Sequence, residues 1–183
     1  NWMLIARGEM DISAVVVALG KLMQYSMDTA RAMVSLEEEY RNVRDYLMIQ
    51  KNRLEDRLEF TLELDEPLKC FPVPKLILQP LVENAIIHGL DGCANGYICI
   101  YAAQKDGILR ISVTDDGCGM GQEMLDWMNS PNPAKRDGHL GLYNVIQILK
   151  LYYGEEYGIQ AESDTSGTTV TIRLPAKKEA PHV

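Results

Sequence analysis

The spacing of apolar residues changes near Phe60, and this change constrains the fold more than any other feature of the sequence. Before it, apolar residues recur every three or four positions, as on one face of a helix. After it, Phe60, Leu62 and Leu64 alternate with polar residues as in a strand, and three prolines follow between positions 67 and 74. We therefore divide the chain into a helical segment (1–62), a mixed domain (63–176) and a frayed tail (177–183).

Two amphipathic helices are expected in the first segment. The first carries an apolar stripe from Ile12 to Met27, with Asp11 as its N-cap. The second follows Ser35, with Glu38 as the reciprocal capping partner. Its heptad-like stripe comprises Leu36, Tyr40, Val43, Leu47, Gln50, Leu54 and Leu58. Because one helical hairpin buries little apolar surface, we expect two copies to form a four-helix bundle, and hence a homodimer through these helices.

The mixed domain is predicted to contain helices and hairpins. Residues 75–89 suit a helix if Pro80 lies in its first turns. Strands are expected at 97–102 and 108–114, joined by the hairpin turn Asp106–Gly107. The segment 118–137 lacks periodicity and is predicted to be a mobile lid. A helix at 140–153 and a hairpin of strands at 159–163 and 169–174 complete the domain.

Composition excludes several classes of protein. The chain has 18 Lys and Arg against 26 Asp and Glu, a net charge of −8, which argues against a nucleic-acid partner. No apolar run approaches the roughly 20 residues that cross a bilayer, so we expect a soluble fragment without membrane contact. The four cysteines lack the spacing of a zinc site.

Two polar segments stand at the ends of predicted elements. The helix around residues 81–89 places Glu83, Asn84 and His88 on one side, which is either a ligand site or an ordinary polar face. Asp115 follows a strand, where its carboxylate can accept a hydrogen bond from an exocyclic amine. Gly117 and Gly119 would then let the backbone approach a ligand, although an Asx turn explains this segment equally well.

A third segment, Gly138-His139-Leu140-Gly141-Leu142, opens the helix predicted at 140–153. Backbone N–H groups at such a helix start can receive phosphate. A glycine pair at this spacing is common, so the segment is weak evidence when it is considered alone.

The order of these segments is more specific than any one of them. In this order the chain resembles the ATP-binding domain of histidine kinases, gyrase and related chaperones. The ordered segments are a helix with Glu-Asn-Ala, a strand followed by DxGxG, a long loop, the GxxGL segment, and Gly167-Thr168-Thr169 before a last strand. The segments Leu78–Ala85 and Tyr46–Arg53 narrow the resemblance to sensor histidine kinases of the LytS/YesM type. The resemblance implies an α+β fold: a two-layer α/β sandwich of the Bergerat type with a mixed sheet, preceded by a helical-hairpin dimerisation remnant.

The resemblance also implies roles for individual residues. Asn84 corresponds to the Mg²⁺ ligand, Asp115 to the acceptor of the adenine amino group, and Glu83 to a residue that polarises the incoming nucleophile. Gly117 and Gly119 are implied to lie beside the base. The phosphate side is implied to comprise Gly138, Gly141, Leu142 and Thr168, with His88 either a phosphate contact or a structural histidine.

The implied function is that of the catalytic fragment of a two-component sensor kinase on the cytoplasmic side of the cell membrane. It would bind Mg-ATP and transfer the γ-phosphate to a histidine upstream of this chain, for relay to a response regulator. His88, His139 and His182 lie outside the two predicted helices, so we expect nucleotide binding without self-phosphorylation.

Three residues depart from the family pattern and bear on the alternative functions. His139 replaces a glycine and Ile87 replaces a lysine, which favour a nucleotide-binding signalling scaffold with a degenerate pocket. Pro80 stands where gyrase-like ATPases carry a general-base glutamate, which disfavours efficient ATP hydrolysis.

Overall fold

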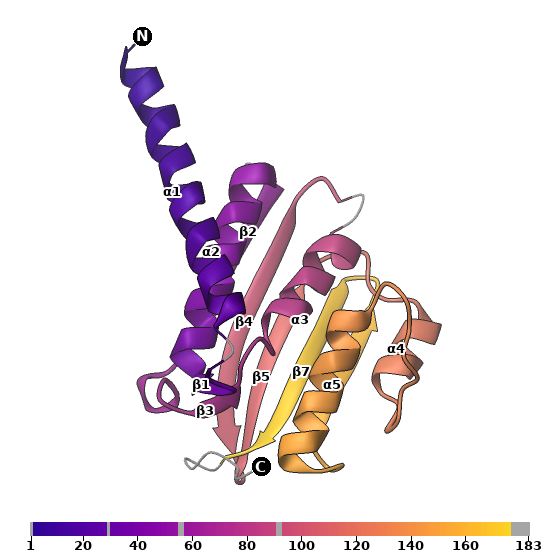
Figure 1. Ribbon diagram of the computed structural model, residues 1–183. Coiled ribbons are helices and arrows are strands. Elements are labelled where there is room, and N and C mark those ends of the chain that lie inside the picture. The colour runs from indigo at the N-terminus through magenta and orange to yellow at the C-terminus, as the bar shows by residue number, and fades with distance from the viewer. Residues whose placement is uncertain (1, 29, 55–56, 91–92, 177–183) are drawn as a thin grey trace.

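A mixed five-stranded sheet organises the chain (Figure 1). The computed structural model describes residues 2–28, 30–54, 57–90 and 93–176, and the side chains from residue 15 onward within these ranges. Strand β2 pairs in parallel with β4, and the other neighbouring strands are antiparallel. In sheet order the strands are β2 (Leu58–Glu63), β4 (Gly96–Lys105), β5 (Ile108–Asp115), β7 (Gly167–Pro175) and β6 (Gly158–Asp164).

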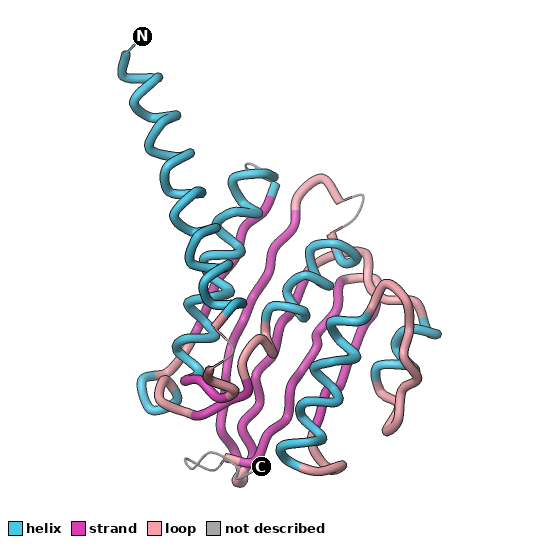
Figure 2. The backbone as a smooth tube through the Cα atoms, viewed as in Figure 1, coloured by secondary structure: helices cyan, strands magenta, loops and turns pink. Residues whose placement is uncertain are grey.

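Helices cover one face of this sheet (Figures 1 and 2). They are α2 (Leu36–Leu54), α3 (Gln79–Asn84) and α5 (Leu140–Tyr153). The opposite face carries polar pairs between strands, including Ser112 with Thr171 at 2.9 Å and Thr114 with Thr169 at 3.0 Å. This arrangement confirms the predicted two-layer α+β sandwich with a mixed sheet.

Shorter elements connect these layers. A small antiparallel sheet pairs β1 (Met33–Ser35) with β3 (Pro72–Pro74), and the 3-10 helix η2 (Glu66–Leu68) precedes β3. Helix α4 (Gln122–Met128) packs beside β6, and Met128 is buried. The prediction that residues 118–137 lack regular structure was therefore wrong over α4.

The hydrophobic core lies between the sheet and the three helices. Ile98 and Ile100 on β4 are fully buried because alternate side chains of a strand point to the same face. They belong to one cluster with Leu81 of α3 and Leu149 of α5. The expected hairpin turn at Asp106–Gly107 is present, with positive φ angles of 53° and 75°.

Helix α2 is a layer of this α/β unit. The predicted capping box is confirmed: the Ser35 and Glu38 N–H groups donate to the other residue's side chain at 3.0 and 3.2 Å. However, α2 ends at Leu54, and the prediction that Leu58 continues its stripe was wrong because Leu58 begins β2. Four stripe residues pack in the same core as the sheet, namely Leu36, Tyr40, Val43 and Leu47.

Helix α1 (Trp2–Met27) begins well before the predicted start, so Asp11 lies inside it and is not an N-cap. Its N-terminal part projects away from the rest of the molecule (Figure 1). Ala18 is buried, whereas a stripe at steps of three and four residues is exposed. The stripe comprises Val16, Leu19, Met23 and Met27.

The helix predicted at 75–89 begins four residues later, at Gln79, with Pro80 in its first turn as expected. The preceding residues form a turn in which Leu76 has a φ of 62°. The helix ends in a π-helical turn, η3 (Ala85–Gly89). The predicted helix 140–153 is confirmed as α5, and the predicted tail at 177–183 lies outside the described residues.

Candidate nucleotide-binding site

Two adjoining cavities lie where α3, the end of β5 and the start of α5 meet. The larger measures about 190 Å³ and the smaller about 80 Å³. Asn84 and His88 line both, so the two cavities form one site. The larger is further lined by Gly89, Asp115, Gly119, Met120, Gly121, Met124, His139 and Thr168. The smaller is further lined by Pro80, Glu83, Ile87, Gly138, His139, Gly141 and Leu142.

Buried residues of α3 hold Asn84 at the junction of the cavities. Leu81 and Val82 anchor the helix in the core, and Asn84 itself is only 8% exposed. Among the described residues, none forms a side-chain hydrogen bond with Asn84. Because a buried amide normally finds a polar partner, Asn84 is available to a ligand that enters the site.

A short polar chain orients Glu83, which lies beside the smaller cavity. The Asn42 amide donates to the Gln79 side-chain oxygen at 3.1 Å, and the Gln79 amide donates to the Glu83 carboxylate at 2.8 Å. Asn42 is buried on α2. Helix α2 therefore positions a carboxylate at the edge of the site.

Asp115 lies at the end of β5 and is 4% exposed. Burial raises the pKa of its carboxyl group, while hydrogen bonds from the backbone amides of Gly117 and Thr168 act in the opposite direction. The Gly117 N–H donates to Oδ1 of Asp115 at 3.1 Å. Such a carboxylate in a cavity wall can accept a hydrogen bond from a ligand amine.

The two glycines after Asp115 are required because a side chain at either position would clash with the backbone of the protein itself. A Cβ at Gly117 would lie 1.8 Å from the carbonyl oxygen of Gly89. Gly119 has a φ of 78°, and its Cβ would lie 2.0 Å from the carbonyl oxygen of Asp164. Gly119 lines the larger cavity, whereas Gly117 lies behind Asp115 and lines neither.

Two histidines lie close together at the smaller cavity. The ring centroids of His88 and His139 are 5.0 Å apart, and Trp127 stands 6.2 Å from His139. Burial lowers the pKa of His139, and the nearby charges of His88 and Arg136 lower it further. The ring of His139 is therefore favoured in its neutral form beside the first turn of α5.

The structure brings together nine of the ten residues that the sequence singled out, and Gly117 supports them from behind. The prediction missed Met120 and Met124, which give the larger cavity an apolar side. Met120 directly follows the glycine motif, and the Met124–Met128 spacing on α4 was an available helical signal.

The fold and this site define a class: an ATP-binding α/β sandwich of the histidine kinase type. The family described as histidine kinase-, DNA gyrase B-, and HSP90-like ATPase matches residues 73–178, and the histidine kinase family matches residues 1–58. The chain belongs to the histidine kinase-, DNA gyrase B- and HSP90-like ATPase family.

The chain is also similar in sequence to individual sensor histidine kinases. The chain is 36% identical to the sensor histidine kinase YesM of Bacillus subtilis over 98% of its own length, and 29% identical to the sensor histidine kinase YpdA of Escherichia coli over 90%. It spans 30% and 28% of these relatives. The predicted resemblance to LytS/YesM-type kinases is thereby confirmed.

Solved structures agree on the fold. The catalytic domain of the histidine kinase ThkA aligns with 80% of this chain and 97% of its own, with 24% identity and a TM-score of 0.61. The histidine kinase domain of the Erythrobacter litoralis EL346 blue-light activated kinase aligns with 94% of this chain and 83% of its own, with 19% identity and a TM-score of 0.58. Within the described residues, no helix is both long enough and apolar enough to span a membrane.

Proposed function

We propose that this chain is the catalytic part of a two-component sensor histidine kinase, which binds Mg-ATP and transfers its γ-phosphate to a histidine upstream of Asn1. The observation that carries the proposal is the convergence of Asn84, Asp115 and the start of α5 on one site. The family match and the similarity to named sensor kinases support it.

The nucleotide would lie across both cavities. Its adenine would enter the larger one, with the amino group donating to Asp115 and the ring between Met120 and Met124. Thr168 would contact the nucleotide from the start of β7, and Gly119 and Gly117 would shape the base-side wall. The phosphates would lie in the smaller cavity against Gly138, Gly141 and Leu142, where the N–H groups of α5 favour negative charge.

The residues present fit a magnesium ion that is carried by the nucleotide. Asn84 offers a buried amide oxygen without a partner among the described residues, and the same part of the chain holds no cluster of three His, Cys, Asp or Glu side chains for a metal. Mg²⁺ suits such a site because it takes few protein ligands and keeps phosphate and water oxygens. When bound, it would offset charge on the transferred phosphoryl group.

Glu83 would act on the incoming nucleophile. Its carboxylate, oriented by Gln79, could accept a proton or a hydrogen bond from the attacking imidazole. His88 and His139 could each donate a ring N–H to phosphate oxygens in the smaller cavity. Pro80 lies in the same wall and offers no base for water, which favours transfer over hydrolysis.

The parent protein would lie on the cytoplasmic side of the cell membrane and pair with a second copy through its N-terminal segment, residues 1–62. Within this segment α1 would form the contact, because the stripe of α2 is buried in the core. The exposed apolar stripe of α1 supports this pairing. A response regulator is the proposed recipient of the phosphoryl group. ThkA, which shares this fold, has been solved in complex with the response regulator TrrA.

Calorimetry with a non-hydrolysable ATP analogue and Mg²⁺ tests the site. We expect saturable binding that Asp115→Ala weakens by about 1.5 to 3 kcal/mol, or roughly 10- to 150-fold, because the adenine amino group loses its acceptor. Asp126→Ala is the matched control, since Asp126 is exposed on α4 and its side chain, among the described residues, accepts a hydrogen bond only from Gln122. Unchanged binding by Asp115→Ala would refute the adenine assignment.

A second assay separates the kinase from the scaffold alternative. A chain extended with its natural upstream residues is incubated with γ-labelled ATP, and acid-labile phosphate on histidine is measured. Labelling that Glu83→Gln reduces while ATP affinity is unchanged supports the kinase. Nucleotide binding without any labelling favours the scaffold with a degenerate pocket, to which His139 and Ile87 point.

A further inference from the structure

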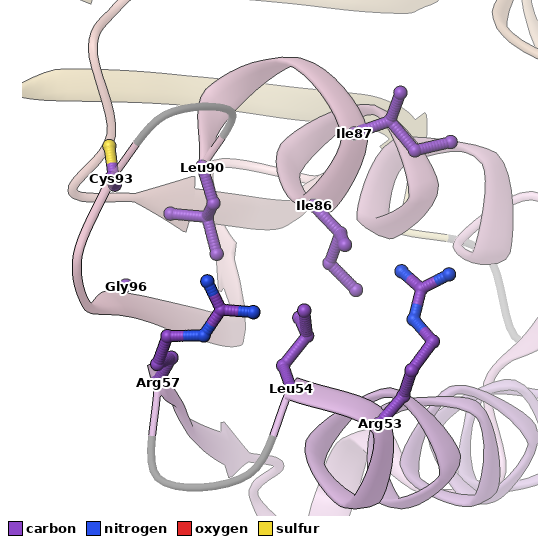
Figure 3. A pocket seen from close by; sticks show the side chains of 8 residues that line it. All are labelled: Arg53, Leu54, Arg57, Ile86, Ile87, Leu90, Cys93 and Gly96. Atoms are coloured by element: carbon purple, nitrogen blue, oxygen red, sulfur yellow. The ribbon is translucent and has the colours of Figure 1, made fainter.

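A third cavity, larger than either part of the nucleotide site, opens on the other side of the π turn. It measures about 430 Å³, within the size range of small-molecule sites. Figure 3 shows Arg53 and Arg57 on one side of this cavity, with Ile86 and Leu90 facing them. We call it the arginine cavity.

The polar wall of the arginine cavity carries two cations. Arg53 lies in the last turn of α2, and Arg57 directly precedes β2. Both side chains are exposed at the cavity, and among the described residues neither forms an ion pair. By contrast, Lys51 on the last turn of α2 pairs with Glu59 at 2.7 Å. The two guanidinium groups stand on either side of Leu54 and both extend toward the opposite wall (Figure 3), so an anionic head group in the cavity can accept hydrogen bonds from either of them.

The opposite wall is aliphatic. It is formed by Ile86, Ile87 and Leu90, and Leu54 adds apolar surface on the side of the two arginines (Figure 3). Ile87 is 57% exposed, although Ala85, Ile86 and Gly89 of the same turn are buried. A bare inorganic anion would leave this wall in contact with water, whereas an aliphatic chain would cover it.

We propose that the arginine cavity binds an amphipathic anion, a molecule with a carboxylate or phosphate head and an aliphatic body. The head would lie between Arg53 and Arg57, and the body would pack on Leu54, Ile86, Ile87 and Leu90. The head-binding arginines line neither nucleotide cavity, whereas Ile87 borders both the arginine cavity and the smaller nucleotide cavity.

Calorimetry of the whole chain with octyl phosphate, inorganic phosphate and octanol tests this proposal. We expect saturable binding of octyl phosphate, with inorganic phosphate and octanol each at least tenfold weaker. The Arg53→Gln/Arg57→Gln double variant should lose at least tenfold in affinity for octyl phosphate. Leu54→Gln, at a residue that lines the arginine cavity and neither nucleotide cavity, should weaken octyl phosphate binding and leave inorganic phosphate binding unchanged.

The matched control is Arg44→Gln, which should bind octyl phosphate like the parent chain. Arg44 is also exposed on α2, but it lies nine residues before Arg53 and therefore about 180° away around the helix. Asp115→Ala should likewise leave octyl phosphate binding unchanged, because it alters only the nucleotide site. Since both arginines are exposed, their variants should fold, and circular dichroism checks this. If the double variant does not fold, the binding of octyl phosphate is measured with the two single variants instead.

Three results would overturn the proposal: no saturable binding of octyl phosphate, equal binding by the double variant, or equal binding of octanol. If inorganic phosphate bound as tightly as octyl phosphate, the proposed contact between the aliphatic body and the apolar wall would be wrong. Sedimentation with vesicles of phosphatidylglycerol then identifies the source of the head group. Arginine-dependent binding to these vesicles, but not to phosphatidylcholine, assigns a lipid; binding of octyl phosphate alone assigns a free metabolite.

Discussion

At the scale of single residues, the fold changes the acid–base chemistry of Asp115, which lines the larger nucleotide cavity. Its burial raises the pKa of the carboxyl group above the ordinary value, so it protonates at a higher pH than an exposed aspartate does. Once protonated, it loses one acceptor site toward the adenine amino group. The affinity for ATP should therefore decline as the solution becomes acidic.

This dependence can be measured by titrating the ATP analogue at a series of pH values from neutral downward. We expect affinity to fall as pH falls through the raised pKa of Asp115. Asp115→Asn is the control, because its amide oxygen still accepts a hydrogen bond but does not titrate in this range, and it also corrects for protonation of the nucleotide. The same pH profile in both proteins would contradict the assignment.

Gly119 is the second residue whose role is set by geometry. Its φ of 78° and the 2.0 Å approach of its would-be Cβ to the Asp164 carbonyl leave no room for a side chain. Gly119→Ala should lower the free energy of unfolding by about 1 to 3 kcal/mol, measured by urea denaturation. Gly121→Ala is the control: its φ is −63° and nothing lies within 4 Å of an added Cβ. Equal stability of the two variants would mean that the loop relaxes freely.

At the scale of elements, Glu39 joins three segments that are distant in sequence. This carboxylate is fully buried on α2 and accepts backbone hydrogen bonds from Leu76, Ile77 and Leu78 at 2.7 to 3.0 Å. The Tyr25 hydroxyl of α1 donates to it as well. Glu39 therefore fixes the turn that leads into α3 and attaches α1 to that turn.

Glu39→Gln tests this junction. The substitution keeps the shape but directs an NH₂ group at backbone donors, so we expect a loss of about 1 to 3 kcal/mol in the free energy of unfolding. Tyr25→Phe removes only one donor and should cost less. Urea denaturation of both variants measures the difference, and a Glu39→Gln protein as stable as the parent would show that the turn does not depend on this carboxylate.

The sequence predicted elements well where a local pattern decides the structure. The Ser35–Glu38 capping box and the Asp106–Gly107 turn depend only on neighbouring residues, and both are confirmed. The prediction failed where contacts between residues distant in sequence decide the structure. Leu58 fits the α2 stripe by spacing, but parallel pairing with Gly96 on β4 places it in a strand. The site motifs were found because each is short, whereas the role of Glu39 depends on residues 76–78 and left no local signal.

At the scale of the whole molecule, one apolar surface remains outside the core. The stripe of Val16, Leu19, Met23 and Met27 runs along α1 on the side away from its buried Ala18. Exposed apolar stripes with this spacing pair with other helices. A second copy of the chain is the partner that the proposed function requires.

Sedimentation equilibrium measures this pairing. We expect self-association of the chain that Leu19→Glu/Met23→Glu weakens at least tenfold, because two carboxylates would enter an apolar interface. Lys21→Glu is the control: it changes the net charge by the same −2, and Lys21 is exposed off the stripe. Equal weakening by both variants would show that the effect is one of net charge and not of the stripe.

The π turn that ends α3 makes the two sides of the molecule depend on each other. The Leu90 N–H bonds to the Ala85 carbonyl five residues back at 3.0 Å, so this turn holds one residue more than an α-helical turn. Deleting a single residue there would restore ordinary helical winding and change the directions in which the remaining side chains of the turn point. His88 and Gly89 would shift in the nucleotide cavity, and Ile86 and Leu90 would shift in the arginine cavity at the same time. The length of this turn is therefore under a double constraint, and insertions or deletions within it should be tolerated far less than substitutions.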